Sequence, residues 1–500
     1  MGSFTEASGT HVDENGPAKR RLSPPRLLIS SAVFGIIFTA LFAKQGLGLN
    51  LTLIFLLVYA YAVFNRNLIL AKTFRQEKLL YLFTIPTIYL SISLFTSSSM
   101  INVLSVLVIL AVMYVQYVVL SGSALNSWDE GGFLIDMIFA GINRVLFGAI
   151  RFVGDSIGSL FRGKKKSGAL IGVGAGVILL LIVVPLLVGA DANVSDILGQ
   201  FIDNLALGDV FLYVFLFVLG ASLVMAPAAT ALEHECTGPR KAFYITQRPI
   251  QAVTTGTALA MIAVVYVLFA SVQFSYFFAP QETVANVLGL TSSAYAVRGF
   301  GELIFITCLN FVLILVAMRF TQQKDGKTSA SLKALYVLLI AFNFVILASS
   351  HLRMQCYELS YGYSVARFLS HSFMLLLVIL NIIMLARIFS DKVKLVRLFA
   401  AAALIYFCAV VAVNPERYVA GENIRRYEQT GKIDAEYLFS LSGDALSDVC
   451  DFAAAHPDTL DTVVEQQAEY KLKSLERKTG WPSLNLADNR AKGKLQELLR

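Results

Sequence analysis

Long apolar runs separated by short polar segments are the main pattern along this chain. Each run is continuously apolar for about 20 residues, the length at which an α-helix crosses the hydrocarbon core of a bilayer. Because the runs do not alternate apolar and polar positions, they favour helices over the strands of a membrane barrel. The pattern predicts eleven spans, which are Leu27–Ala43, Leu47–Phe64, Leu79–Phe95, Ile101–Leu120, Ala169–Val188, Asp209–Ala226, Ala252–Phe274, Gly301–Met318, Leu332–Ser349, Phe368–Ala386 and Leu395–Val413.

The stretch Phe133–Phe161 is apolar but interrupted, and it does not fit a span. Ile135, Ile138 and Ile142 recur at helical spacing, while polar residues such as Arg151 fall on the other side. This amphipathic pattern predicts a helix that lies in the membrane interface. A helix packed beneath the bundle fits the same pattern.

The chain changes character at both ends. Residues 1–26 are polar and are predicted to form a disordered tail, whereas residues 414–500 are rich in charge and in helix formers. Gly and Pro residues divide the second region into short helices, predicted near 419–428, 435–441, 445–455 and 460–478. The expected fold is an all-α integral membrane protein, with about eleven transmembrane helices in residues 27–413, an interfacial amphipathic helix in 133–161 and a small C-terminal helical extramembrane domain.

The basic residues alternate from gap to gap between the apolar runs. Twenty-five of the 41 Lys and Arg residues lie in every second gap, and the intervening gaps hold only Lys44, Arg298, Arg353 and Arg367. Lys and Arg beside short loops stay in the cytoplasm. We therefore expect a cytoplasmic N-terminus and, because the number of spans is odd, a C-terminal domain on the outer, non-cytoplasmic side of the membrane.

Composition sets the class of protein and of partner. With 56% hydrophobic and 15% charged residues, the chain is too apolar for a soluble fold. The net charge of +7 comes from loops beside spans, where it suits the bilayer and its anionic lipids rather than nucleic acid. No nucleotide-binding, hydrolase or kinase motif occurs, and the five Cys residues lack metal or redox spacing, so no cofactor, metal or catalytic residue is predicted. Cys356 and Cys450 fall on the same predicted side, which is compatible with a disulfide.

The densest polar group lies in the predicted outer loop between the ninth and tenth spans. An aromatic rim with two Arg side chains suits a phosphate or carboxylate headgroup. An interfacial belt of Tyr, with Arg paired to Glu358, explains the same residues. The candidate ligand-binding residues of this loop are Arg353, Tyr357, Glu358, Tyr361, Arg367 and His371.

A second group of polar residues lies in or near the spans themselves. Glu302 begins the eighth span with Arg298 one turn before it, so the two either neutralise each other or contribute to a ligand site. Asn310, Asn343 and Asn381 lie deeper in three different spans. Such amides either line a polar path or form hydrogen bonds between helices.

Two stretches, Arg353–Arg367 and Asn414–Val449, resemble a bacterial multipass membrane family known as a domain of unknown function. The resemblance is to the group numbered four-one-seven-three, with four-one-five-three as a related group. It implies a protein of the bacterial cytoplasmic membrane and supplies no reaction or ligand. The second stretch is the more specific, and its motif residues are Asn414, Asn423, Arg426, Asp434, Tyr437, Ser442 and Asp444.

These features favour a component of the cell envelope that binds, senses or assembles, acting through the outer loop and the C-terminal domain on an envelope protein partner. A transporter or lipid flippase is compatible with the number of spans and with Glu302. A membrane enzyme acting on a lipid-linked substrate is the third hypothesis, with His351, Glu358 or His371 as the acid or base. The sequence leaves the oligomeric state open.

Overall fold

The computed structural model describes residues 24–70, 72–122, 207–237, 249–277, 292–323, 328–459, 462–478 and 480–500, together with 124, 126–128, 133, 137 and 154–156. Side chains are described throughout these ranges except at 207–208, 226–237, 272–277, 292–303, 353, 356, 357 and 359–361. Residues 1–23 of the polar tail, most of the amphipathic segment 133–161 and the fifth predicted span, Ala169–Val188, lie outside the described residues.

The other ten predicted spans coincide with α-helices, which confirms the all-α membrane fold. Seven helical segments of the described residues are long and apolar enough to cross a bilayer, and Leu49–Phe64, Asp209–Met225 and Ile304–Phe320 are shorter apolar helices. The elements are α1 (Pro25–Phe42), α2 (Leu49–Phe64), α3 (Arg66–Ile69), α4 (Lys78–Leu82), α5 (Thr84–Thr96), α6 (Ile101–Leu120), α10 (Leu207–Thr237), α11 (Ala252–Phe277), α13 (Ser292–Phe320), α14 (Ala330–Tyr361), α15 (Val365–Phe389) and α16 (Leu395–Val413).

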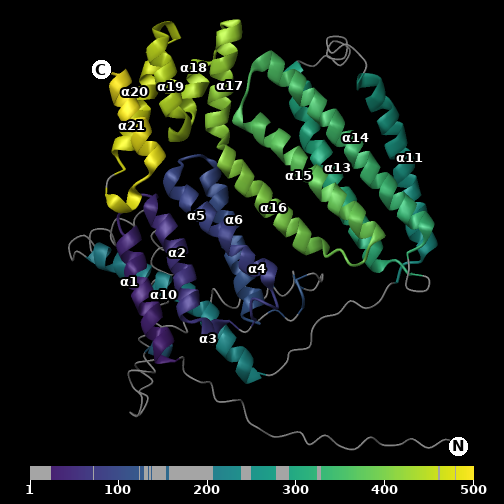
Figure 1. Ribbon diagram of the computed structural model, residues 1–500, viewed down its shortest axis with the longest axis horizontal. Coiled ribbons are helices and arrows are strands. Elements are labelled where there is room, and N and C mark those ends of the chain that lie inside the picture. Colours follow the sequence, from purple (N-terminus) through teal and green to yellow (C-terminus); the bar gives the residue numbers. More distant parts are fainter. Residues whose placement is uncertain are drawn as a thin grey trace, which may run out of the picture.

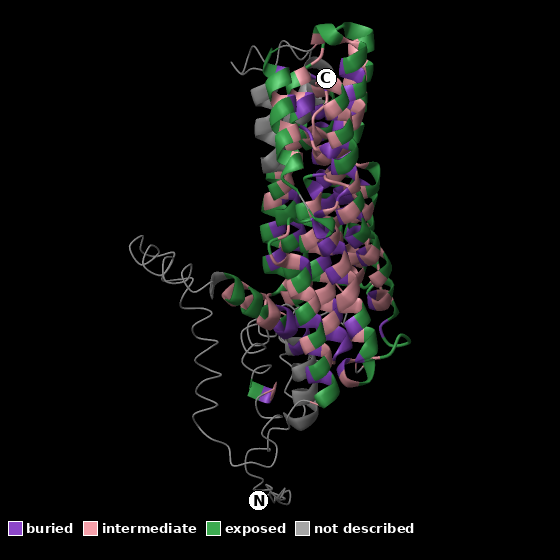
Figure 2. Ribbon diagram, turned by 90° about the vertical axis from the view of Figure 1, so that its left-hand side faces the viewer, coloured by how far each residue is buried: buried purple, intermediate pink, exposed green. Residues whose placement is uncertain are grey.

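The helices form two groups, and α16 joins them (Figure 1). The first group contains α1, α2, α5, α6 and α10 and packs around residues such as Phe55 and Leu90. The second contains α11, α13, α14 and α15 and packs around residues such as Leu339. Helix α16 contributes Leu404 to the first core and Phe399 to the second. Buried residues lie inside both groups and exposed residues cover the outside (Figure 2).

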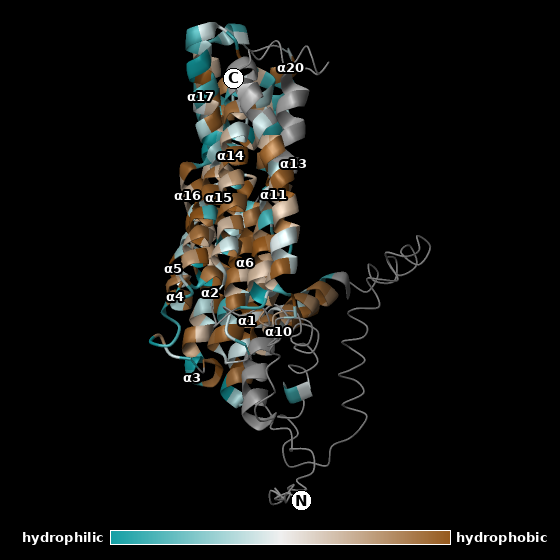
Figure 3. Cartoon of the chain, turned by 90° about the vertical axis from the view of Figure 1, so that its right-hand side faces the viewer, coloured by the Kyte–Doolittle hydropathy of each residue, from teal (hydrophilic) through white to brown (hydrophobic). Residues whose placement is uncertain are grey.

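The bundle has two distinct ends. Five further elements, which we call the C-terminal unit, lie at the upper end in Figure 1, and the connections Asn65–Glu77 and Ser390–Lys394 lie at the lower end. The helices between the two ends are mostly hydrophobic, whereas α17 is hydrophilic (Figure 3). The C-terminal unit consists of α17 (Pro415–Thr430), α18 (Ala435–Ser440), α19 (Gly443–Ala455), α20 (Thr462–Glu476) and α21 (Leu486–Leu498).

The C-terminal unit has a hydrophobic core of its own, built from residues such as Leu438, Leu446 and Leu495. Helix α21 was not predicted, although Asn485 caps its first turn and Leu495 is fully buried. Cys450 is a free thiol inside this core, and burial raises its pKa to about 12. The disulfide between Cys356 and Cys450 is therefore not formed.

The predicted outer loop between the ninth and tenth spans is largely helical. Helix α14 has 32 residues and continues to Tyr361, well beyond the length of about 20 residues that a bilayer needs. The connection to α15 is only Gly362–Ser364, and its Gly362 has a φ of 81°. The expectation of a long outer loop was wrong because the polar residues of this segment are as compatible with a solvated helix as with a loop.

At the lower end, a buried carboxylate joins α16 to the segment before α4. The Glu77 carboxylate accepts a hydrogen bond from Trp128 Nε1 at 3.2 Å and lies 3.7 Å from Lys72 and 3.6 Å from Arg397. The Arg397 guanidinium also lies 4.9 Å from the centre of the Trp128 ring. Opposite charges therefore surround Glu77, as a buried acid requires.

Three buried amides join four helices in the middle of the second group. Tyr266 on α11 donates a hydrogen bond to Asn310 on α13 at 2.8 Å, and Asn310 donates to Asn343 on α14 at 2.7 Å. Asn343 donates to Asn381 on α15 at 3.0 Å, and Asn381 donates to the Leu377 carbonyl at 2.8 Å. Each of the three Asn residues is fully buried. They hydrogen-bond between helices, which is one of the two roles that the sequence allows.

We predict that Asn343→Ala lowers the free energy of unfolding by about 1–2 kcal/mol, because it leaves the Asn310 amide and the Asn381 carbonyl without their partners. The thermal unfolding midpoint of the purified protein in detergent measures this change. Leu338→Ala on the same helix is the control, since Leu338 is 41% exposed. Equal midpoints for the two variants would contradict a structural role for the chain of amides.

Candidate functional site

The C-terminal unit rests on three connections at the upper end of the bundle. We call this contact the docking seam, and define it by Ala43–Gly48, Ser97–Met100 and Gly362–Ser364 together with the residues of the C-terminal unit that bind them. Its polar contacts come from side chains of α17, α18 and α19 and from Asn485 at the start of α21.

Glu416 is the most buried acid of the seam, with 1% of its surface exposed. One carboxylate oxygen accepts from Ser99 Oγ at 3.2 Å and from the Met100 amide at 2.9 Å. The other oxygen accepts from the Ser442 amide at 2.6 Å. One side chain therefore joins the α5–α6 connection to the start of α19, and three donors satisfy its charge.

The sequence Asn-Pro-Glu explains how Glu416 reaches this position. Asn414 ends α16 in a left-handed conformation, with a φ of 54°, and its Oδ1 accepts from the Arg417 amide at 3.4 Å. Pro415 then occupies the first turn of α17, where its missing N–H costs nothing. Glu416 follows in the same turn, near the positive end of the helix dipole.

Asp444 binds the same connection from α19. Its Oδ2 accepts from Ser97 Oγ and from the Ser98 amide, each at 2.7 Å, and the Asn414 side chain also hydrogen-bonds to this carboxyl. Burial is the main cause that raises the pKa of Asp444 above its usual value, and these hydrogen bonds oppose the shift. Asp444 lies in the first turn of α19, but its carboxylate binds outside its own helix.

Asn485 completes the contact with α5 from the last helix of the chain. Its Nδ2 donates to the Leu94 carbonyl at 3.1 Å and to the Ser97 carbonyl at 2.8 Å, while its Oδ1 caps α21. Nearby, the Leu49 amide donates to the Leu484 carbonyl at 2.9 Å. A Cβ on Gly48 would lie 2.5 Å from the Ser483 backbone, so this position accepts only glycine.

Asn423 binds the α14–α15 connection through both the N–H and the C=O group of Tyr363. Its Oδ1 accepts from the Tyr363 amide at 3.1 Å, and its Nδ2 donates to the Tyr363 carbonyl at 2.9 Å. Tyr437 accepts from the Val365 amide through its hydroxyl at 3.0 Å. A Cβ on Gly362 would lie 2.8 Å from Arg426 Nη1, which shows how closely α17 approaches this turn.

The remaining predicted motif residues act within the C-terminal unit. Asp434 caps α18 by accepting from the Tyr437 amide at 2.9 Å. Ser442 stands at the N-cap of α19 without a side-chain cap, and its amide binds Glu416. The motif that carries the family resemblance is therefore largely a set of seam contacts and helix caps.

The predicted headgroup residues divide into two sets. Arg367 donates to the Gly362 carbonyl and so stabilises the turn. Glu358 and His371 belong to a chain of polar side chains on α14 and α15. The side chains of Arg353, Tyr357, Tyr361, Arg298 and Glu302 lie outside those that the structure describes, so the pairing of Arg298 with Glu302 stays a prediction.

The polar chain runs from Gln355 to Glu358 through two imidazole rings. Gln355 Nε2 lies 3.1 Å from His351 Nε2, His351 Nδ1 lies 3.0 Å from His371 Nδ1, and His371 Nε2 lies 3.2 Å from Glu358. The two imidazole rings hydrogen-bond to each other, whereas His371 Nε2 lies at ion-pair distance from Glu358 without a hydrogen bond to it. An imidazole beside a carboxylate is a pair that acid–base chemistry can use.

Sequence reasoning missed Glu416, the serines Ser97–Ser99 and Asn485. A local pattern could have indicated Glu416. It directly follows a span and an Asn-Pro pair, and this pattern is typical of the first turn of a helix. No such pattern indicated the serines, since they are small polar residues in a short loop. Within the described residues, no group of three or more His, Cys, Asp or Glu side chains is arranged to hold a metal ion.

A bundle of apolar helices with a polar unit docked on one end defines a multi-pass, all-α integral membrane protein. Residues 82–449 match the family described as a domain of unknown function, DUF4153. Because the match spans more than half of the chain, the protein belongs to this family. The resemblance to the group numbered four-one-seven-three stays an expectation. No curated protein and no solved structure matches the chain.

We predict that Glu416→Ala destabilises the docked C-terminal unit by about 3 kcal/mol or more, because it leaves three buried donors without their acceptor. Limited proteolysis between α16 and α17 measures undocking, and thermal unfolding in detergent measures the stability. Glu465→Ala is the control, since Glu465 is an exposed acid on α20. Equal cleavage rates for the two variants would contradict the role of Glu416.

The raised pKa of Asp444 gives the seam a pH dependence. A carboxyl whose pKa is higher when docked than when exposed adds stability below its ordinary value of 3.8, and this contribution is lost as the pH rises through the docked pKa. Asp444→Asn removes this titration. We therefore expect the stability advantage of the native protein over Asp444→Asn to shrink as the pH rises from about 4, measured by thermal unfolding of both proteins across a pH series. A stability difference between the two proteins that stays constant across the pH series would contradict the raised pKa of Asp444.

Proposed function

We propose that this protein is an assembly or binding component of the bacterial cell envelope that holds its C-terminal unit firmly on the outer end of a membrane bundle. The single observation that supports this most strongly is the docking seam. Its buried acids and amides serve to fix the unit in place rather than to form a reaction centre. A fixed unit presents the same surface to a partner at all times, which lowers the entropic cost of binding.

Helix α20 offers the surface that a protein partner would contact. Val463 and Tyr470 are seven residues apart, so they lie on one face of the helix, and they are 50% and 76% exposed. Trp481, in the connection that follows, is 62% exposed. Exposed aromatic residues of this kind dominate the energetics of many protein interfaces.

The distribution of basic residues supports an outer location for the C-terminal unit in the bacterial cytoplasmic membrane. The lower end carries cations at five connections or helix ends. The upper side of the bundle carries fewer, namely Lys44, which pairs with Asp209 at 2.6 Å, Arg298, Arg353 and Arg367. The lower-end cations of the described residues are Arg26, Arg66, Lys72, Arg75, Lys78, Arg319, Lys333, Arg387, Lys392, Lys394 and Arg397.

We predict that alkaline phosphatase fused after Arg500 is active in bacterial cells, because this enzyme folds only in an oxidising compartment outside the cytoplasm. A green fluorescent protein fused at the same site should stay dark when it is exported by the general secretion route. A fusion after Lys392, at the lower end, is the matched control with the opposite pattern. Fluorescence at Arg500 would overturn the outer location.

We predict that the double change Val463→Ala and Tyr470→Ala abolishes complementation of a deletion strain while leaving the thermal unfolding midpoint within about 2 °C of the native value. The control is Glu465→Ala, which changes an exposed residue on another side of α20. Glu416→Ala should also fail to complement, since it releases the unit. If every one of these variants complements fully, the proposed binding role fails.

One observation favours a second function, an enzyme acting on a lipid-linked substrate. His351 and His371 hydrogen-bond to each other, and His371 Nε2 lies 3.2 Å from Glu358, so an imidazole and a carboxylate that could serve as acid or base lie together near the upper end of α14 and α15. A turnover of envelope lipids that His371→Ala abolishes and His456→Ala preserves would support it. Turnover that persists in His371→Ala would reject it.

The transporter or flippase alternative has less support. The amides of Asn310, Asn343 and Asn381 hydrogen-bond to one another across the second helix group. These three side chains therefore do not line an open polar path for a substrate. Substrate flux into vesicles that contain the purified protein would revive this alternative. We therefore rank it third.

A further inference from the structure

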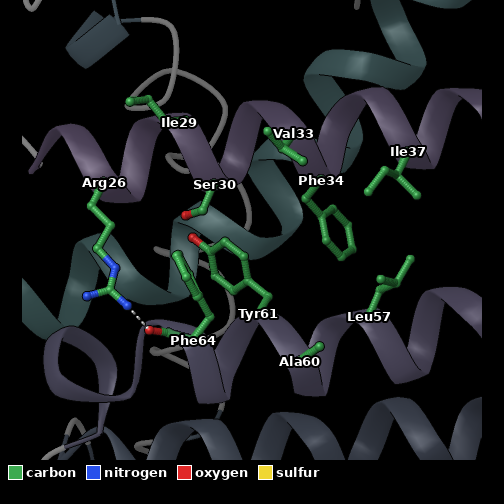
Figure 4. Close-up of a pocket in the computed structure, with 10 residues that line it drawn as sticks. All are labelled: Arg26, Ile29, Ser30, Val33, Phe34, Ile37, Leu57, Ala60, Tyr61 and Phe64. Atoms are coloured by element: carbon green, nitrogen blue, oxygen red, sulfur yellow. Dashed lines mark hydrogen bonds between the residues drawn. The ribbon is translucent and has the colours of Figure 1, made fainter.

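A groove lies between α1 and α2 towards the lower end of the bundle (Figure 4). Its volume is about 480 Å³, which falls in the range of about 300–1,000 Å³ typical of ligand pockets. Apart from Arg26, Ser30 and the Tyr61 hydroxyl, its walls are hydrocarbon. The lining residues are Arg26, Ile29, Ser30, Val33, Phe34, Ile37, Leu57, Ala60, Tyr61 and Phe64.

The groove opens away from the protein core. Phe34 and Tyr61 form its inner wall and are 5% and 8% exposed, whereas Ile29 and Phe64 are 64% and 56% exposed. Helix α1 is long and apolar enough to cross the membrane, so this open side faces lipid hydrocarbon. Water finds too few partners in such an apolar space, and a hydrocarbon chain fits it.

The polar groups of the groove lie at one end, where α1 begins and α2 ends. Arg26 stands in the first turn of α1, donates to the Phe64 carbonyl and lies 4.3 Å from the centre of the Phe64 ring (Figure 4). A guanidinium has five N–H donors, and this hydrogen bond uses one of them. The Arg26 side chain is exposed, so its charge is accessible to a headgroup at the membrane surface.

We propose that the groove between α1 and α2 binds an anionic glycerophospholipid. One acyl chain lies along the apolar walls, and the phosphate binds the Arg26 guanidinium. The charge of Arg26 at the end of an apolar groove distinguishes this site from general contact with the bilayer. Such a site favours a ligand that has both an acyl chain and an anionic group. Basic pockets between transmembrane helices bind anionic lipids by the same chemistry.

Native mass spectrometry of the purified full-length protein tests the site, with phosphatidylglycerol or phosphatidylcholine added as the probe. We expect the native protein to retain phosphatidylglycerol in preference to phosphatidylcholine. Arg26→Ala should lower phosphatidylglycerol occupancy about tenfold and remove the preference, since a charge-assisted hydrogen bond is lost. Ala60→Phe fills the groove and should lower the occupancy of both lipids.

Arg75→Ala is the matched control, because Arg75 is an exposed cation in the connection between α2 and α4 and does not line the groove. It should leave the retention of both lipids unchanged. Arg26→Lys, which keeps the charge without the planar fork, should retain an intermediate preference and so guards against a folding defect in Arg26→Ala. Equal retention of phosphatidylglycerol by the native protein, Arg26→Ala and Ala60→Phe would overturn the proposal.

Discussion

The buried carboxylate of Glu416 is the interaction on which the upper end of the structure depends. A charge taken out of water is stable only where several donors surround it. Here the donors come from two separate parts of the chain, the α5–α6 connection and the start of α19. The charge can therefore be satisfied only when the C-terminal unit is in place, which makes docking and burial of Glu416 a single event.

The same constraint recurs through the bundle in different chemical forms. At the lower end Glu77 lies between Lys72 and Arg397, and in the second helix group three amides satisfy one another across neighbouring helices. A hydrocarbon environment offers no water to an unpaired polar group, so each buried polar side chain needs a protein partner. These contacts fix which helices become neighbours, while apolar packing supplies most of the contact area.

The candidate site combines residues that the sequence suggested with residues that it did not. Asn423, Tyr437 and Asp444 belong to the recognised motif, and each binds a connection of the bundle. Their partners are backbone groups or short serines, which have no distinctive pattern. The polar segment after the ninth span was expected as a loop with a headgroup site, yet α14 runs through it and its His351 contacts His371 on α15. The types of side chain alone do not show whether a polar segment folds as a loop or as a solvated helix.

The sequence by itself determined the membrane class, the apolar part of ten spans that the structure shows as helices, and the division between an apolar bundle and a polar C-terminal region. It could do so because span length and apolar continuity are local properties imposed by the thickness of the bilayer. Only the tertiary structure decided that Glu416, Asp444 and Asn485 meet one loop, that α21 completes the core of the C-terminal unit, and that Arg26 lies at the mouth of a groove. Those contacts join residues up to several hundred positions apart, and no local pattern records which distant donor a buried acceptor will find.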